Sequence, residues 1–479
     1  MKAAVKAYVA MMMIVMTAAT SASQETPTER ESARDVVRRL DSLEHSLELP
    51  ALVSRLTGPN AARDAVVARA KTLMDTELLA LSDDITRHPE VGFQEKRSVQ
   101  LLIDYLRRHD FAVDVGTPGL PTAFVAHYTK SSGGPNLGVI VEYDALRGTK
   151  GAFHGDQHSA QGPVGLAAAV AIAEYLTKSG TPGRVTVFGT PGEEMMPPAA
   201  KTVMHEGKVF DGADILVRSH STMTTSRPAP GFGSCCMNIE GVKYTFSGAP
   251  AHQLTAWNGR NALTAVIHLF ENIDAMRSNI RPEARIQGVV TEGGAAPNVV
   301  PDRAAADFYV RYPDEIYLAQ LAEMVDNAAR AAALATGTKV KIDHYGSARD
   351  GIGLGVLNEL AFAYEKKFGA TGVAPEPGKP QGYEETGSVS SDIPGVGFSA
   401  KTSNAPNHTY EMEQDALGGV GHQGFTVDAE AMAALLFDFA TRPEYRALVK
   451  REFQAIQGLK SEYLADLRKT YVVPKVPEP

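Results

Sequence analysis

The stretch LGVIVEYDAL, residues 137–146, decides the fold class of this 479-residue chain. Its apolar half, Leu137 to Val141, predicts a buried strand, and its polar half leads to Asp144. Three more apolar runs lead in the same way to His or Glu side chains. Since open α/β sheets bind ligands beyond the carboxyl ends of their strands, the four runs predict one sheet edge able to hold metal ions. This pattern is typical of a hydrolase.

The other three apolar runs occupy residues 185–188, 215–217 and 396–399. The residues to which they lead are, in chain order, Glu193 with Glu194, His220, and His408. The two histidines are weak candidates alone, so their assignment depends on the shared strand edge.

A dense group of possible ligands follows the first run in the segment HGDQH, residues 154–158. His154, Asp156 and His158 lie within five residues, directly before an Ala- and Val-rich segment that predicts a buried helix. Imidazole and carboxylate suit zinc, manganese or cobalt, and the lack of a nearby Cys pair argues against a structural zinc knuckle. A lone histidine is more often structural, whereas this clustering at a strand end favours metal ligands, and Asp156 can bridge two ions.

Glu193 and Glu194 are adjacent carboxylates that repel each other, so their burial as ions requires a cation. One can bind metal, while the other can take a proton from water that the metal makes more acidic. A solvated acidic loop is the alternative, but the apolar residues at 195–198 favour a functional pair. His252, in the segment SGAPAH, can polarise a carbonyl group or simply be exposed, and the sequence leaves both open.

The order of predicted elements divides the chain into an outer and an inserted part. Strands alternate with helices in residues 24–236 and 351–479, which predicts an α/β domain with a mostly parallel sheet. Residues 237–350 instead follow the order β-α-β-β-α-β, which is the ferredoxin-like (α+β) pattern.

Composition and the N-terminus bound the function further. The net charge of −9 argues against a nucleic-acid partner. Residues 1–23 resemble a signal peptide, with two lysines before a short apolar stretch and small residues after it, so we expect export to the periplasm or the medium. No later stretch is apolar for long enough to predict a membrane span. The only cysteines, Cys235 and Cys236, are adjacent, which predicts two small strand residues rather than a disulfide framework.

Several motifs together resemble the zinc aminoacylase/carboxypeptidase metallopeptidases. The closest likeness is to the amidohydrolase branch that contains p-aminobenzoyl-glutamate hydrolase and related dipeptidases. It extends from about His88 to Phe437. The motifs that carry it are HPEVGFQE (88–95), EYDAL (142–146), GTPGEE (189–194), PAH (250–252), GVVTEGGAAPNVVPD (288–302) and FYVR (308–311).

The resemblance implies a di-metal peptidase domain with an inserted lid that mediates homodimerisation. Two divalent ions, zinc in the family, would sit at the site, and the substrate would be a small amide with a free carboxylate. Carried over motif by motif, the implied metal ligands are Asp156, His158, Glu194, His220 and His408. The implied general base is Glu193, and His252 is the lid histidine that reaches a substrate carbonyl, often in the partner subunit. Asn298 and Arg311 are implied near the substrate, and we expect Asp144 and His154 beside the ligands.

One departure from the branch concerns the bridging ligand. The usual pattern is His-x-Cys-Gly-His, whereas this chain has Asp156 in place of the Cys. A carboxylate shifts the metal preference away from soft ions, which leaves the metal identity open. The sequence therefore predicts a metal-dependent amidohydrolase for N-acyl or N-aroyl amino acids or dipeptides. A dipeptide exopeptidase and a binding protein that has lost catalysis are the alternatives.

Overall fold

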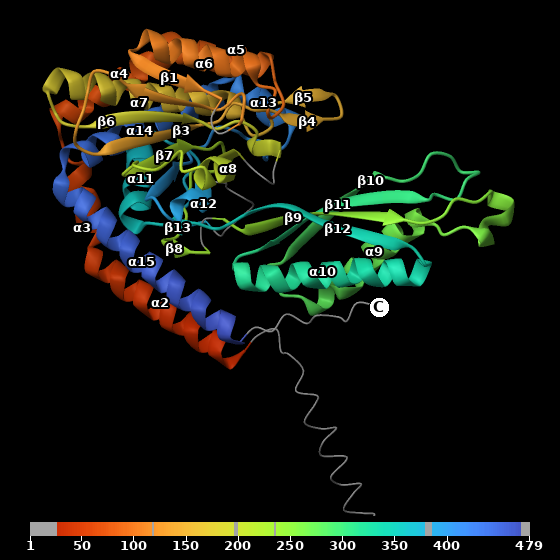
Figure 1. Cartoon of the computed structure of the whole chain (residues 1–479). Helices are drawn as coiled ribbons and strands as arrows, with labels where there is room; N and C mark the ends of the chain where they lie inside the picture. Colours follow the sequence, from red (N-terminus) through yellow and green to blue (C-terminus); the bar gives the residue numbers. More distant parts are fainter. Residues whose placement is uncertain (1–25, 117–118, 196–199, 234–235, 379–385, 471–479) are drawn as a thin grey trace, which may run out of the picture.

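The computed structural model describes residues 26–470, except 117–118, 196–199, 234–235 and 379–385. The predicted signal peptide therefore lies outside the described residues. The structure has two parts, each built on its own sheet, and the smaller part projects from the larger one (Figure 1). Among the described residues, no helix is both long and apolar enough to cross a membrane.

A six-stranded sheet in the order β1-β2-β6-β3-β7-β14 forms the centre of the larger part. The strands are β1 (Phe111–Val115), β2 (Phe124–Tyr128), β3 (Asn136–Val141), β6 (Arg184–Gly189), β7 (Ile215–Ser219) and β14 (Gly395–Phe398). The last four pair in parallel, and only β1 and β2 run antiparallel to their neighbours. The predicted α/β class with a mainly parallel sheet is confirmed.

Helices bury both faces of this sheet. Every residue of β3 is buried, as expected for a central parallel strand, and its side chains alternate between two apolar clusters. The larger cluster contains helix α7 (His158–Ser179), the buried helix predicted after HGDQH. The other helices of this part are α3 (Leu49–Thr57), α4 (Ala61–Leu73), α5 (Leu79–Arg87), α6 (Lys96–Arg108), α8 (Ala200–Glu206), α11 (Gly355–Lys367), α12 (Thr386–Ser390), α13 (Tyr410–Ala416) and α14 (Gly419–Thr441). A hairpin of β4 (Leu146–Gly148) and β5 (Gly151–Phe153) precedes α7.

The smaller part, which we call the lid, is an antiparallel sheet with two helices packed against it. Its elements are β9 (Asn238–Ser247), α9 (Ala262–Met276), β10 (Arg285–Glu292), β11 (Arg303–Tyr312), α10 (Glu315–Thr336) and β12 (Lys339–Ala348). The order β10-β11-β9-β12 is that of a ferredoxin-like sheet, which confirms the predicted inserted α+β fold.

Two short strands mark where the chain leaves and rejoins the larger part. They are β8 (Gly231–Phe232) and β13 (Ile352–Gly353), and they pair with each other. Asp350 ties the two crossings together, since its carboxylate accepts hydrogen bonds from the backbone N–H groups of Gly233 and Cys236. Cys236 itself is disulfide-bonded, which differs from the plain strand residue expected, while Cys235 lies outside the described residues.

Two long helices from opposite ends of the chain run side by side toward the lid (Figure 1). These are α2 (Pro27–Leu47) and α15 (Pro443–Thr470), which we call the strut. The Ser32 hydroxyl donates to Asp466 at 2.6 Å across the pair. At the far end of α2, the carboxylate of Glu29 takes two hydrogen bonds from Arg281 of the lid, at 2.5 and 2.9 Å.

Candidate metal centre

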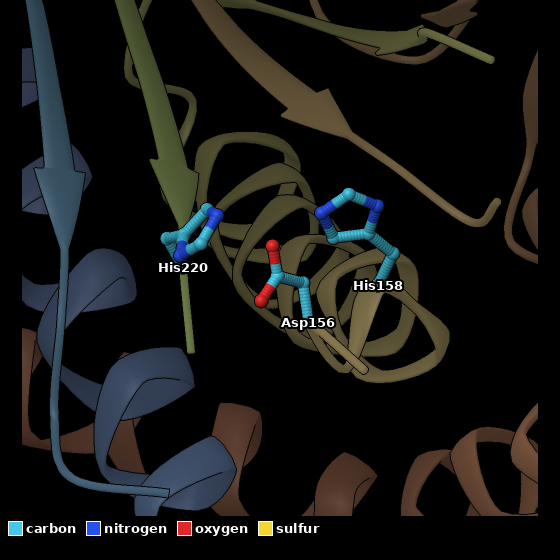
Figure 2. Close-up of side chains that lie close together, drawn as sticks. All are labelled: Asp156, His158 and His220. Carbon is cyan, nitrogen blue, oxygen red and sulfur yellow. The ribbon is translucent and has the colours of Figure 1, made fainter. Parts of the chain in front are cut away.

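The carboxyl ends of neighbouring strands bring the predicted ligands to one place. Glu193 and Glu194 follow β6, His220 follows β7, and His408 lies in the loop after β14. The remaining two, Asp156 and His158, lie where the connection from β3 enters α7. Figure 2 shows Asp156, His158 and His220 turned toward one another.

Three groups of side chains each place their ligand atoms within 4.8 Å of one another. The groups are Asp156, His158 and His220; Asp156, Glu194 and His408; and His158, Glu193 and Glu194. The first two contain every residue predicted as a metal ligand. Because Asp156 belongs to both, its carboxylate is placed where a bridging ligand would stand.

Hydrogen bonds orient two histidines, the buried His158 and the half-buried His220, toward this centre. The Nδ1 atom of His158 lies 2.9 Å from Oδ1 of Asp144, whose other oxygen accepts from the backbone N–H of Glu194 at 2.8 Å. The Nδ1 atom of His220 bonds the carbonyl oxygen of Ser221 at 3.0 Å. In both rings Nε2 remains for a metal, which is the usual way a protein sets the ring of a ligating histidine.

The donor set fits divalent metal ions. Within the described part of the chain, Nε2 of His158 is buried and has no hydrogen-bond partner. Such an orphaned atom is costly unless something outside the hydrogen-bond network satisfies it. A cation bound by histidine nitrogens and carboxylate oxygens is the natural occupant, and this chemistry suits zinc, manganese or cobalt.

The pKa shifts of the carboxylates also indicate that the centre favours a bound cation. Burial raises the pKa of Glu193 to about 8, against the opposing pull of Lys201 and His158. Burial likewise raises the pKa of Glu194 well above its usual value, and the charge of Glu193 adds to the rise. Burial would also raise the pKa of Asp156, but the hydrogen bond from His408 and nearby histidines hold it below its usual range. Bound cations would favour the ionised form of all three side chains.

His408 forms the open side of the centre. Its side chain is 59% exposed, and Nε2 lies 2.9 Å from Oδ2 of Asp156. Its backbone has a φ of 64°. This left-handed conformation is uncommon for a non-glycine residue and is often seen at functional sites. The neighbouring Asn407 donates from its amide to Oδ1 of Asp156 at 2.6 Å, a contact that sequence reasoning missed.

The lid residues do not join these groups within one chain. β9 starts at Asn238 beside the crossing and ends at Ser247. Its far end is therefore roughly 30 Å from the crossing, at about 3.3 Å per residue. His252 and Asn298 both lie exposed in loops at that far end, where the carbonyl of Asn298 accepts from the N–H of Gln253. The Nδ1 atom of His252 accepts from the N–H of Leu254, which leaves its Nε2 pointing away from that bond.

Two further predicted residues take different positions. Arg311 lies on β11 close to the crossing, with its guanidinium 5.9 Å from the ring centre of Tyr309. His154 is buried, and neither ring nitrogen forms a well-aligned hydrogen bond among the described residues. Burial lowers the pKa of His154 to about 3, so its ring is neutral. The hydrogen bonds that orient the ligands therefore come from Asp144, Ser221 and Asn407, and none comes from the His154 ring.

The fold and the ligand groups resemble those of metallohydrolases with two metal ions. A peptidase dimerisation domain of the M20 type is recognised over residues 233–336. The human Xaa-Arg dipeptidase is 29% identical over 397 residues, which cover 78% of this chain and 88% of that protein. One of the subunits of the p-aminobenzoyl-glutamate hydrolase from Escherichia coli is 30% identical over 277 residues, 54% of this chain and 56% of that one.

Solved structures agree on the fold. A putative aminohydrolase from methicillin-resistant Staphylococcus aureus superposes with a TM-score of 0.61 at 19% identity, over 79% of this chain and all of that one. A dinuclear metal-binding M20 peptidase from Bacillus subtilis gives a TM-score of 0.53 at 19% identity, over 76% of this chain and 98% of that one. The chain is similar to the M20 metallopeptidases in sequence and in fold, which confirms the resemblance that its motifs carry and the prediction of an enzyme.

Proposed function

We propose that this protein is an amidohydrolase that uses two divalent metal ions to cleave an N-acyl or N-aroyl amino acid or a dipeptide. The observation that carries the proposal is the shared Asp156, which belongs to two adjoining ligand groups with Glu193 beside them. The bound ions would acidify a water molecule and polarise the substrate carbonyl. The rest of the reaction falls to side chains of the protein.

Glu193 is the proposed general base. Its carboxylate is buried at the centre, with Oε2 4.0 Å from Nε2 of His158. A base in this position takes a proton from the attacking water and returns it to the leaving amine. Glu194 is the proposed ligand of the pair, because its carboxylate lies with Asp156 and His408 in the second group.

His252 is proposed to act on the substrate carbonyl of a partner subunit. The loop that carries it lies at the far end of the lid, where it cannot reach its own centre without a large movement. The recognised dimerisation domain supports a homodimer that brings this loop to the other chain. Two large apolar side chains on the same loop, Leu254 and Trp257, are 72% and 80% exposed. Exposed apolar side chains of this size suit a contact surface. Asn298 would arrive with His252.

The substrate class is proposed from the relatives and from Arg311. The two curated relatives are named for a dipeptide and for an aroyl amino acid, and both substrates carry a free carboxylate. Arg311 can pair with such a group from the crossing side of the lid. A dipeptide exopeptidase is the second candidate, because the match to the dipeptidase covers more of this chain than the match to the hydrolase.

The test is hydrolysis of a panel of N-acyl amino acids, N-aroyl amino acids and dipeptides, with and without chelator. We expect turnover of at least one class, loss of turnover on chelation, and recovery with zinc, manganese or cobalt. Elemental analysis of the same protein should give about two ions per chain. A protein that binds members of the panel, carries metal and turns over none of them would be a binding protein that has lost catalysis.

Export is a separate proposal that rests on residues 1–23. Fractionation of expressing cells, with the N-terminus of the mature protein sequenced, tests it. Accumulation of the full-length chain inside the cell would overturn it.

A further inference from the structure

A buried ion pair between Glu142 and Lys201 lies beside His158 of the centre. Glu142 follows β3, and its Oε1 accepts a hydrogen bond from the ammonium group of Lys201 on α8. The side chains of both residues are almost completely buried, at 2% and 0% exposed. The second oxygen, Oε2, is different: among the described residues it has no hydrogen-bond partner. An ionised oxygen left unpaired in the interior requires a positive group nearby.

A ring nitrogen of His158 close to this oxygen is a second atom that needs a cation. Nε2 of His158 lies 3.8 Å from Oε2 of Glu142 and is itself without a partner among the described residues. Because Nδ1 is directed at Asp144, a neutral His158 presents a lone pair at Nε2. Two buried lone pairs then face each other, which is unfavourable unless a proton or a metal ion lies between them.

The spacing fits two ligands of one ion better than a shared proton. The two atoms are 3.8 Å apart. That separation is too long for a hydrogen bond. Zinc binds nitrogen and carboxylate oxygen at about 2.0–2.2 Å, so two ligand atoms of one ion lie no more than about 4.3 Å apart. The ammonium group of Lys201 at the other oxygen keeps the Glu142 carboxylate charged, as a metal ligand must be.

We propose that Glu142 is an additional ligand of the ion held by Asp156, His158 and His220, and that Lys201 positions its carboxylate. The inference rests on the proposed two-metal site and deepens it. The first ion would have four protein ligands, as closed sites do, whereas the ion held by Asp156, Glu194 and His408 would have three. The second ion, on the exposed side, would then keep the open position for water or substrate.

The competing explanation is that Glu142 only neutralises Lys201. The two explanations separate when the pair is removed as a unit. Glu142→Gln removes the charged oxygen but leaves a buried lysine without its carboxylate, which should lower the stability of the fold. The double variant E142Q/K201M removes the lysine charge as well and should recover that stability. Lys201→Met alone keeps the proposed ligand.

The experiment titrates Co²⁺ into chelator-treated protein, followed by its absorption spectrum and by calorimetry, with thermal unfolding of each metal-free variant. We expect two ions in the wild type and in K201M. In E142Q and in the double variant, we expect one of the two ions to bind at least about 10-fold to 100-fold more weakly. The double variant should also melt above E142Q, so that metal loss cannot be assigned to a damaged fold.

A double variant that binds both ions with wild-type affinity overturns the proposal, and so does equal weakening in K201M and E142Q. A wild type that binds a single ion, with unchanged affinity in E142Q, overturns it too. Wild-type protein that binds no Co²⁺ defeats the two-metal site itself. Failure of the two-metal site is thereby distinguishable from failure of the Glu142 assignment, in which the wild type still takes two ions.

Discussion

The metal centre and the far end of the lid are built in opposite ways. At the centre, hydrogen bonds to Asp144 and Ser221 orient the rings of the buried His158 and the half-buried His220. At the far end of the lid, His252 and Asn298 are exposed and have only neighbouring loop residues as partners. In the proposed mechanism, one chain completes the half of the site that would hold metal, and a dimer would supply the half that would meet substrate. The difference can be tested from either side.

The largest expected effect comes from removing the residue shared by two ligand groups. Asp156→Ala should lose metal and with it all turnover, because Asp156 is the residue that the first two ligand groups share. Elemental analysis and activity measure the change. Asp274→Ala is the matched control, since Asp274 is an exposed aspartate on the lid paired only with Arg277 in the described structure. Full metal occupancy in Asp156→Ala would remove this side chain from the ligand set.

The second change separates metal binding from proton transfer. Glu193→Ala should keep its metal and lose about 10²-fold to 10⁴-fold in kcat, the usual contribution of a general base. Metal content and kcat are measured on the same preparation. A variant that turns over at the wild-type rate would assign the proton transfer to another group.

The third change tests whether the two halves come from different chains. Asp156→Ala and His252→Ala are each expected to be inactive or nearly so, the latter by about 10²-fold to 10³-fold if His252 stabilises the oxyanion. After unfolding together and refolding, mixed dimers should contain one intact site, with metal from one chain and His252 from the other. Activity should then return to about a quarter of the wild-type value in a two-fold dimer.

No recovery on mixing, with mixed dimers verified by differently tagged chains, would place His252 in the site of its own chain or outside catalysis. The control is a mixture of Asp156→Ala with Glu193→Ala, which should stay inactive because both changes fall in the same half of the site.

The sequence predicted which residues follow the strands, but it did not predict contacts between distant segments of the chain. The strand-end pattern predicted Asp156, Glu194 and His220 together, because parallel strands deliver their following residues to one edge. The contacts of Asn407 with Asp156 and of Lys201 with Glu142 join segments far apart in the chain, and no periodicity indicates them. The prediction that His154 lies beside the ligands stays a prediction, since its ring forms no well-aligned hydrogen bond within the described structure.

The strut could not be predicted either, because its two helices come from opposite ends of the chain. The segment from α2 to α5 is mostly helical, but the turn at Glu48, with a φ of 48°, lets α2 leave the core. Both strut helices lie outside the part of the chain that resembles the family. Their contact with the lid makes the lid's position a property of this chain as well as of any dimer.

The smallest expected effect tests that last point. Arg281 pairs with Glu29 and lies 4.2 Å over the ring of Tyr317, so Arg281→Ala leaves a buried carboxylate without that partner. We expect a loss of about 1–3 kcal/mol in unfolding free energy, less than for a completely buried pair. The reason is that the Arg281 side chain is 15% exposed. Urea unfolding measures the loss, and Arg277→Ala, which removes an exposed arginine of the same segment, is the control.

If Arg281→Ala and Arg277→Ala lose the same unfolding free energy, the strut does not hold the lid in place. The orientation of the lid then depends on the dimer alone. If only Arg281→Ala also opens the crossing at Asp350 to proteolysis, the chain itself holds the lid in place before a partner arrives. The chain that would hold the metal then also sets the direction of its own lid. Dimerisation would only bring the loop with His252 to the centre of the partner subunit.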